Sequence, residues 1–457
     1  MDKSELSLPP GPRALPWLGH LPAFLADPLA FLTKLQRDYG DVVAFRVGLQ
    51  PSILISDPAL IDRVVRDRTF ERTQSTRKAL GTLAGIGLLS LEGSQHLRHR
   101  RLMAPAFHRE RIKRYVDIMA HETYRMLESW QSGQERDLRE AMMRLTFSIV
   151  SRSLFNTDTG HEAERVDAAL QTAMPWIMPT TMLSRLVRIE QGVYYGKRAR
   201  AAIAELHQIV RDIVRERRAS GEDRGDLLSM LISARDEDGS ALTDQDIGAE
   251  TLTMLLAGHD TTAHTMTWAW YLLTQNPTLL DALTQEVRGT LGEREVGFDD
   301  LPRLTLTDRV VRETLRLYPP AWFADRVNAQ DTELGGFHVP AGTEVVWSTW
   351  VTQRDPRWFA NPVRFDPERF RAERAQSVPE GAYLPFGGGV HMCIGNTFAL
   401  TEARVILAAM AQRFDIRATP HFPVRPRPMV TLGMQHPFAV VPTRHTRAST
   451  FPSALSL

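Results

Sequence analysis

The sequence is poor in the features that would place a protein in a membrane, outside the cell or on nucleic acid. It has one cysteine in 457 residues, so an intrachain disulfide is excluded and a reducing compartment is expected. No apolar run approaches the ~20 residues that span a bilayer, and the first residues lack the apolar stretch of a signal peptide. Lysine and arginine total 55 against 54 acidic residues. We therefore expect a cytoplasmic protein with no membrane anchor and no nucleic-acid partner.

The motifs of several large enzyme classes are also missing. The sequence contains no GxxxxGK(S/T) phosphate loop, no HExxH zinc motif and no GxSxG nucleophile elbow. The stretch GIGLLS at 85–90 is only a fragment of a dinucleotide-binding fingerprint, and no strand–helix pattern surrounds it. Phosphate-loop, zinc-protease and serine-hydrolase functions therefore have no support.

Hydrophobic periodicity predicts a mainly α protein with a small β region. From about 58 to 320 the pattern is almost wholly helical, whereas β-rich text occurs at about 41–57, 337–351 and 429–442. No internal repeat or low-complexity linker divides the chain. We expect residues 1–457 to form one compact unit, with the strand-rich ends meeting in one small sheet beside the helical body.

The single cysteine lies in the glycine-rich loop FGGGVHMCIG, residues 386–395. A lone cysteine is usually a small buried hydrophobe, but no apolar periodicity continues through this loop. The pattern turns helical from Ile394 onward, which places Cys393 just before a helix N-terminus. Such a position favours the thiolate and lowers its pKa. The loop is therefore predicted to present one anionic sulfur to a large, flat group, because its glycines allow close approach.

A second motif, AGHDTT at 257–262, interrupts the longest apolar helical pattern. Gly258 costs helix stability, Thr261 can bond back to the carbonyl of Ala257, and Asp260 is an acid in an apolar run. These residues suggest a groove for a ligand, with an acid and an alcohol to handle protons. The alternative is a tolerated kink with Asp260 facing solvent.

A third motif is the helical stretch VRETLRLYPP, in which Glu313 and Arg316 lie three residues apart and share a face. The simplest interpretation is a surface ion pair. If the pair is buried, it needs further hydrogen-bonding partners, and Arg369 in FDPERF is one candidate.

Basic residues are dense at helical spacing in 93–107. His96 and Arg100 share one face, while Arg98 and Arg101 point elsewhere. One face could bind acidic groups of a cofactor while the other meets an acidic partner, although a basic helix is often only a solvated face.

Taken together, these motifs resemble those of the cytochrome P-450 family of haem-thiolate monooxygenases. The resemblance extends along nearly the whole chain and implies a triangular, mostly helical prism. It is carried by the haem loop with Phe386, Gly389, His391, Cys393 and Gly395, by the E-x-x-R helix and PERF, by AGHDTT, and by the opening PPGP.

The resemblance implies a role for each motif, with haem b as the cofactor. Cys393 would be the iron ligand, Phe386 would shield the sulfur, and Asp260 and Thr261 would deliver protons. Glu313, Arg316 and Arg369 would form a structural network. The haem-binding set would be His96, Arg100, Arg326, Phe386, His391, Cys393 and Gly395, with the propionates held by its histidines and arginines. The wall for a hydrophobic substrate would include Ala257, Ala321, Trp322, Phe323, Met429, Val430 and the 70–92 segment.

The activity that this implies is insertion of one oxygen atom of O₂ into a C–H bond of a fatty acid, terpenoid or polyketide-like molecule. Histidine at position 96, where many members carry tryptophan, is typical of soluble bacterial members. The chain has no expected room for a flavin or nicotinamide domain after the haem loop, so we expect a separate ferredoxin or flavodoxin with its reductase. A peroxide-driven or isomerising haem-thiolate enzyme, or a non-catalytic haem protein, is the alternative; both would have little use for Asp260 and Thr261.

Overall fold

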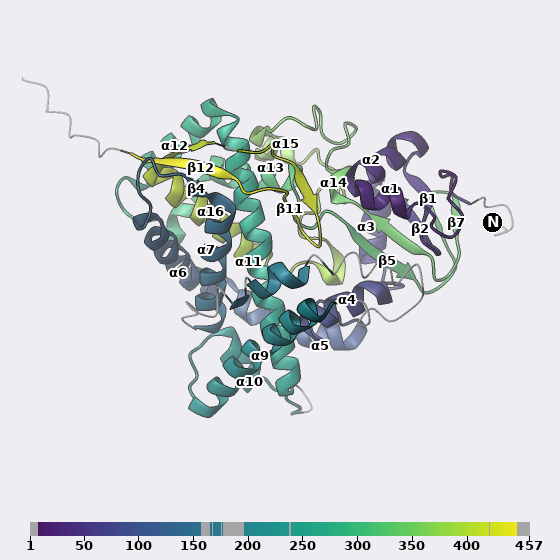
Figure 1. The fold of residues 1–457 in the computed structure, drawn as a ribbon, viewed down its shortest axis with the longest axis horizontal. Helices are drawn as coiled ribbons and strands as arrows, with labels where there is room; N and C mark the ends of the chain where they lie inside the picture. The colour runs from purple at the N-terminus through teal and green to yellow at the C-terminus, as the bar shows by residue number, and fades with distance from the viewer. Residues whose placement is uncertain are drawn as a thin grey trace, which may run out of the picture.

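The structure is a computed structural model that describes residues 8–156, 165–166, 168–174, 176, 196–236, 239–419 and 421–445. Helices form a broad body on one side of the molecule, and a smaller sheet region lies on the other (Figure 1). The prediction of a mainly α protein with a small β region is confirmed. Within the described ranges, no helix is long and apolar enough to cross a membrane.

The described helices follow one another along most of the chain. In order they are α1 (Leu21–Ala26), α2 (Pro28–Tyr39), α3 (Pro58–Arg66), α4 (Gln74–Ala84), α5 (Gly93–Met103), α6 (Arg109–Glu128), α7 (Leu138–Phe155), α9 (Lys197–Ser220), α10 (Leu227–Ser233), α11 (Asp244–Thr274), α12 (Pro277–Leu291), α13 (Thr305–Leu317), α14 (Thr349–Thr352), α15 (Ala372–Ala375) and α16 (Asn396–Arg413). Two short 3₁₀ segments also bear on the site, namely η5 (Pro367–Phe370) and η6 (Gly389–His391).

The strands are short and form separate sheets. They are β1 (Val42–Val47), β2 (Gln50–Ile55), β3 (Phe70–Glu71), β4 (Arg136–Asp137), β5 (Ala324–Asn328), β6 (Thr332–Leu334), β7 (Phe337–Val339), β8 (Glu344–Trp347), β9 (Phe414–Ala418), β10 (Pro426–Pro428), β11 (Leu432–Met434) and β12 (Ala439–Arg444). The largest sheet has the order β1-β2-β8-β5-β3, with β1 and β2 as an antiparallel hairpin and β2 parallel to β8.

The expected union of all the strand-rich ends in one sheet is only partly right. The N-terminal hairpin does pair with β8 from the 337–351 segment. The C-terminal strands do not join it, because β12 pairs with β9 and β4, and β11 pairs with β10. β9 begins directly after α16, and β4 leads directly into α7. These short strands are thus attached to helices of the body, and their sheet stays there.

The central helix, α11, organises the body. Thr243 and Asp246 form a reciprocal capping box at its N-terminus. The helix packs against α7, α9, α13 and α16, and its long apolar surface is buried nearly all round. A Cβ at Gly258 would lie 2.8 Å from the side chain of Val150 on α7. Gly258 therefore lets α7 approach α11, a packing role that its sequence position did not indicate.

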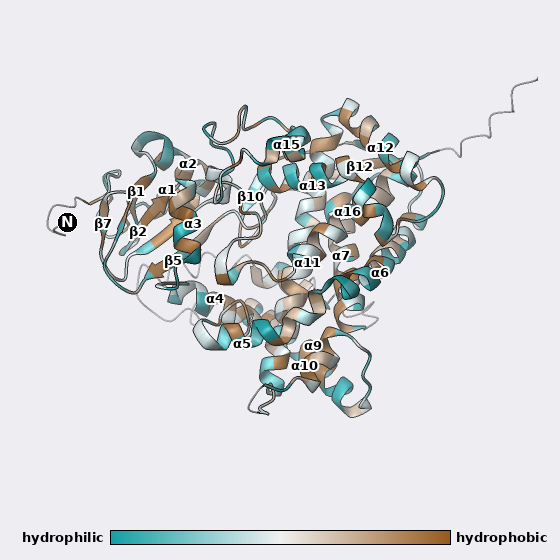
Figure 2. Ribbon diagram, turned by 180° about the vertical axis from the view of Figure 1, so that it is seen from behind, coloured by the Kyte–Doolittle hydropathy of each residue, from teal (hydrophilic) through white to brown (hydrophobic). Residues whose placement is uncertain are grey.

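The apolar residues gather in one large core inside the helical body and two smaller clusters around the main sheet. In Figure 2, β1 and β2 are largely brown, whereas α6 on the outside of the body shows hydrophilic teal. The large core includes side chains of both α11 and α16. Helix α11 carries the AGHDTT motif, and α16 follows the cysteine loop. The shared core therefore holds these two parts of the site against each other.

Candidate functional site

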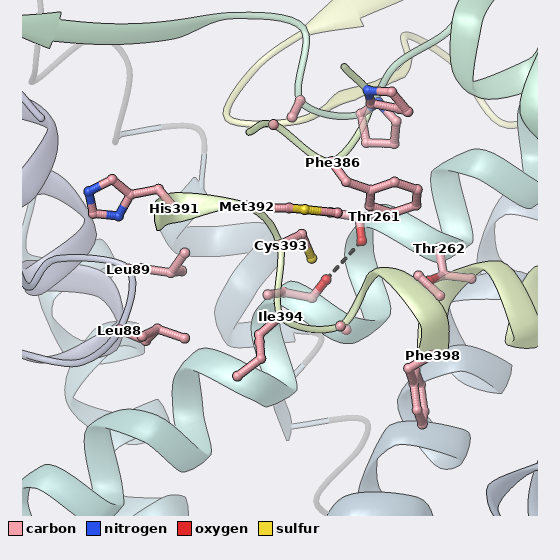
Figure 3. Close-up of a pocket in the computed structure, with 18 of the residues that line it drawn as sticks. Leu88, Leu89, Thr261, Thr262, Phe386, His391, Met392, Cys393, Ile394 and Phe398 are labelled. Atoms are coloured by element: carbon pink, nitrogen blue, oxygen red, sulfur yellow. Dashed lines mark hydrogen bonds between the residues drawn. The ribbon is translucent and has the colours of Figure 1, made fainter. Parts of the chain in front are cut away.

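A cavity of about 380 Å³ lies between α11 and the cysteine loop. Its wall is completed by α5, by the segment after α4, and by residues around β5 and the start of α16. Figure 3 shows side chains of the cysteine loop and of α11 around this pocket. The sequence motifs that lie far apart along the chain are therefore brought to one place.

Cys393 lies at the bottom of this cavity. Its backbone N–H donates to the carbonyl of Phe386 (2.9 Å), which closes the loop. Gly389 has a φ of 61°, and a Cβ there would lie 1.9 Å from the carbonyl oxygen of Val65. Only glycine fits at that position. α16 begins at Asn396, as expected for a cysteine just before a helix N-terminus.

The expected lowering of the Cys393 pKa is wrong for the protein without a bound cation. The sulfur is open to the cavity but lies deep in the protein, away from bulk solvent. Burial raises the pKa of the Cys393 thiol, although the Gly395 backbone and the charge of Arg100 act in the opposite direction. Desolvation thus outweighs the helix terminus, and a bound metal ion would be needed to favour the thiolate.

One end of the cavity is lined by basic side chains. His96, Arg100, Arg326 and His391 all line it, as the resemblance implied, and Arg72 joins them. His391 contacts His96 (Nδ1–Nε2 3.2 Å) and Glu92 (Nε2–Oε2 2.8 Å).

These basic side chains lie close together, with the acids Glu92 and Asp325 beside them. Burial and the charge of Arg326 lower the pKa of Arg72 to about 10, and burial and the charge of His391 lower the pKa of His96 to about 4. Among the described residues, Nη1 of Arg72 has no hydrogen-bond partner, and Oε1 of Glu92 lies 3.8 Å from it. Because a buried guanidinium without a hydrogen-bonded anion is costly, this end suits a ligand that carries carboxylates. Arg72 was not predicted by itself, because only the 70–92 segment as a whole was expected to form cavity wall.

On α11, the acid and the alcohol of AGHDTT face different ways. Thr261 lines the cavity, and its hydroxyl donates to the Ala257 carbonyl (2.8 Å), as expected. Asp260 does not line the cavity. Successive side chains on an α-helix diverge by about 100°, and Asp260 lies on the side of α11 that faces the turn before β11. Asp260 instead accepts a hydrogen bond from Thr431.

A second buried acid was not anticipated. Glu402 on α16 is fully buried, and burial raises its pKa well above the ordinary value, with a partly opposing influence of Thr262. Among the described residues, neither carboxyl oxygen of Glu402 has a hydrogen-bond partner. Thr262 lines the cavity. The sequence signal was present, because Glu402 is an acid within the apolar helical run FALTEARVIL.

The E-x-x-R pair is buried, so the surface alternative is wrong. Nε and Nη2 of Arg316 donate to the two carboxylate oxygens of Glu313, each at 2.7 Å, and neither side chain is exposed. Arg369 on η5 also donates to Glu313 (3.3 Å). Arg316 additionally donates to the carbonyls of Gln353 and Pro362. The extra partners that a buried pair requires are therefore present.

The apolar wall differs in part from the expected one. Ala257 and Ala321 line the cavity, together with the apolar residues Leu88, Leu89, Val150, Leu154 and Met254. Trp322, Phe323, Met429 and Val430 do not line it. Trp322 is buried in the cluster around α1 and α2, and its indole N–H donates to the Met429 carbonyl (2.8 Å). The Trp322–Met429 hydrogen bond thus joins the segment after α13 to the segment before β11, behind the cavity wall. This placement depends on tertiary structure.

Glu250 holds the part of the wall that carries Leu88. Its Oε1 accepts hydrogen bonds from the Leu88 N–H (2.8 Å) and from His99 (2.6 Å), and the side chain is fully buried. A Cβ at Gly87 would lie 3.2 Å from the same carboxyl group. Glu250 thus ties the 85–91 segment and α5 to α11.

The fold and the site define a class of protein. It is mostly helical, and one cysteine sulfur and several basic side chains line a cavity that suits a large cofactor. The chain belongs to the cytochrome P450 family, whose model matches residues 9–438. This confirms the resemblance drawn from the motifs. The family binds haem iron, and the protein is a P450 monooxygenase, an oxidoreductase.

Three curated relatives cover most of the chain. Cyclooctatin synthase and cyclooctat-9-en-7-ol 5-monooxygenase, both from Streptomyces melanosporofaciens, are each 38% identical to it. The alignment covers 92% of both chains for the first, and 90% of this chain and 89% of the relative for the second. Pentalenene oxygenase from Streptomyces avermitilis is 34% identical over 92% of this chain and 94% of its own. The crystal structure of the cytochrome P450DA heme domain superimposes with a TM-score of 0.86 at 27% identity, covering 97% of this chain and 99% of that one.

Proposed function

We propose that the protein inserts one oxygen atom of O₂ into a C–H bond of a terpenoid. The three relatives are named for cyclooctatin and pentalenene chemistry, and the cavity wall above the cysteine is largely aliphatic. One observation carries the proposal. Cys393, the basic side chains and the apolar wall line the same cavity. Of the three substrate classes expected from the sequence, terpenoids are therefore favoured.

The cofactor is haem b in this proposal, and the residues present fit it. Cys393 would bind the iron, while His96, Arg100, Arg326 and His391, together with Arg72, would hold the two propionates. Nη1 of Arg72 has no hydrogen-bond partner among the described residues, and with Arg100 and Arg326 in the same wall it fits two carboxylates. Phe386 and Gly395 line the cavity beside the cysteine. When bound, the haem supplies the activation of O₂.

The protein's own residues position the substrate, exclude water and handle protons. The aliphatic wall offers an apolar skeleton contacts without directional hydrogen bonds. Such a wall suits a cyclic hydrocarbon framework. Thr261 holds a hydroxyl at the cavity, and Asp260 is the acid one residue away that would supply it with protons. Glu313, Arg316 and Arg369 would hold η5 against α13 and so support the cysteine side of the site.

Electrons would come from a separate ferredoxin or flavodoxin with its reductase. Arg98 and Arg101, expected to form the docking surface, both pair with Asp236 (2.8 and 2.5 Å). That acid offsets part of their charge. Leu97, which precedes Arg98 on α5, is an exposed large hydrophobic residue, which suits a partner that combines acidic groups with a small apolar contact. We propose further that residues 1–457 act as one haem domain in the cytoplasm.

The experiment is a substrate screen on the haem-loaded protein. Cyclic terpene hydrocarbons, terpene alcohols and fatty acids are added singly, and the shift of the haem spectrum is recorded. Compounds that shift it are then turned over with a surrogate ferredoxin system under ¹⁸O₂. A terpenoid that gains one ¹⁸O atom supports the proposal. Shifts and products confined to fatty acids would contradict it.

A further inference from the structure

The acid of the AGHDTT motif is held from behind by the turn that leads into β11. Oδ2 of Asp260 accepts a hydrogen bond from the Thr431 hydroxyl (2.6 Å). Oδ1 lies 3.5 Å from Nε2 of His264, one helical turn further along α11. The Asp260 side chain is 20% exposed. The carboxyl group therefore contacts a second element and some solvent, but not the cavity.

The turn itself is firmly anchored, so the position of Thr431 is well defined. The Leu432 N–H donates to the Pro320 carbonyl (3.0 Å), and the Trp268 indole N–H donates to the Leu432 carbonyl (3.0 Å). Asp260, His264 and Trp268 are spaced by four residues and so share one face of α11. That face is the one against which the turn and β11 pack.

His264 is fitted closely against this strand. A Cβ at Gly433 would lie 2.5 Å from Cε1 of the His264 ring, so the ring and a side chain at 433 cannot occupy the same space. Burial lowers the pKa of His264, while the nearby Asp260 carboxylate raises it. Arg139 on α7 and His259 on α11 are the other charged or titratable groups near the ring, and both lower this pKa. His264 is therefore a mostly neutral neighbour at neutral pH.

We propose that Thr431 and His264 are positioning residues for Asp260, and that they hold its carboxyl group away from the cavity until it delivers a proton. The Thr431 hydroxyl donates to one carboxylate oxygen and the His264 ring lies beside the other, so the two residues set the direction in which the side chain points. With the carboxyl group facing the turn, the acid takes its proton from solvent. It delivers that proton only when the side chain leaves Thr431 and turns toward Thr261. The inference rests on the proposed role of Asp260 and Thr261 in proton delivery.

This arrangement links substrate binding to proton delivery. Pro320 accepts from the turn and Ala321 follows it, and both residues line the cavity. A ligand that displaces this wall acts on the Thr431–Asp260 contact through the Leu432–Pro320 hydrogen bond. The acid would then be released when the cavity is filled.

The test compares Thr431→Val, Thr431→Ser and Gly433→Ala with the wild type. Thr251→Val is the matched control, because Thr251 is a buried threonine of α11 that does not line the cavity and donates to the Ile247 carbonyl (2.8 Å). In each holoenzyme, the division of reducing equivalents between product and hydrogen peroxide is measured, together with the solvent isotope effect. The pKa of His264 is followed by NMR in the diamagnetic ferrous–CO form.

We expect Thr431→Val to divert a larger share of reducing equivalents to hydrogen peroxide and to raise the solvent isotope effect, because the hydrogen bond that holds the carboxyl group is lost. Its His264 pKa should shift as well. Thr431→Ser should restore the wild-type values, Gly433→Ala should change them by displacing the ring, and Thr251→Val should match the wild type. A Thr431→Val coupling ratio and His264 pKa equal to those of the wild type would overturn the inference.

Asp260→Asn separates this inference from the function on which it rests. If Asp260→Asn diverts electrons to peroxide while Thr431→Val does not, the relay stands and the positioning role is wrong. If Asp260→Asn leaves coupling unchanged, the proposed proton relay fails and the inference fails with it.

Discussion

Arg316 and Glu313 form a bidentate ion pair, and neither side chain has any exposed surface. The pair sits on α13 and is completed by Arg369 from η5 and by backbone carbonyls of the 353–364 segment. Removal of Arg316 would leave the buried Glu313 carboxylate with only Arg369 and the Asp366 N–H as partners, both on Oε1.

Breaking that pair should destabilise the protein severely. We expect Arg316→Met to lower the free energy of unfolding by about 3–5 kcal/mol, because Glu313 would remain buried and charged. Thermal unfolding and haem content check this. The control is Arg144→Met, since Arg144 forms an exposed i,i+4 pair with Glu140 and such pairs contribute little. Equal stability of the two variants would show that the buried pair does not support the fold.

The buried Glu402 should carry a proton at neutral pH. Its pKa is raised in the folded protein, so the folded state binds a proton that the unfolded state has lost. The stabilisation by this group is complete below the unfolded value of about 4.3 and declines as pH rises toward the folded value. Glu402→Gln removes this dependence.

The measurement is the difference in melting temperature between Glu402→Gln and the wild type from pH 5 to pH 9. We expect the variant to gain relative stability as pH rises. Infrared spectroscopy should also show a protonated carboxyl band that the variant lacks. A constant difference in melting temperature with no such band would mean that Glu402 is ionised.

The 85–91 segment should loosen when its anchor is weakened. Glu250→Leu removes the acceptor for both the Leu88 N–H and His99. We expect faster hydrogen exchange in 85–91 and faster release of a bound azole, with haem retained. Glu286→Leu serves as control, because Glu286 also accepts backbone N–H groups, from Leu306 and Thr307, at a place that does not line the cavity. Unchanged exchange in 85–91 would show that Glu250 does not hold this wall.

Electron transfer from an acidic ferredoxin should depend on Asp236. Asp236→Asn removes the negative charge beside Arg98 and Arg101, so we expect faster first-electron transfer at low salt and a smaller gain at high salt. Glu140→Gln removes one negative charge from a different pair and should leave the rate unchanged. Equal rates in wild type and Asp236→Asn at low salt would show that the ferredoxin docks at another surface.

The parts of the site that the sequence predicted are those encoded within one stretch of chain. Cys393 before a helix and the Thr261–Ala257 hydrogen bond follow from local spacing and backbone geometry, and the structure has both. The i,i+3 spacing of Glu313 and Arg316 predicted that they could pair, whereas their burial depends on what packs over α13.

The parts that the sequence did not predict depend on how distant segments pack. Asp260 faces Thr431 rather than the cavity, and Trp322 lies behind the wall rather than in it. Arg72 lies in the basic cluster although its segment is far from the cysteine in sequence. The directions of Asp260 and Trp322 are set by partners more than a hundred positions away. Arg72 pairs with the nearby Glu92, but that pair meets Arg326 and His391 only in the folded protein.

The central claim is that the sulfur of Cys393 binds haem iron as a thiolate. The most direct measurement is the absorption spectrum of the reduced protein under carbon monoxide, in wild type and in Cys393→His. The wild type should show the strongly red-shifted Soret band that thiolate ligation produces, and the variant should show the band of an imidazole-ligated haem or lose the haem. A wild-type spectrum like that of an imidazole-ligated haem, or a Cys393→His protein that keeps the red-shifted band, would contradict the account.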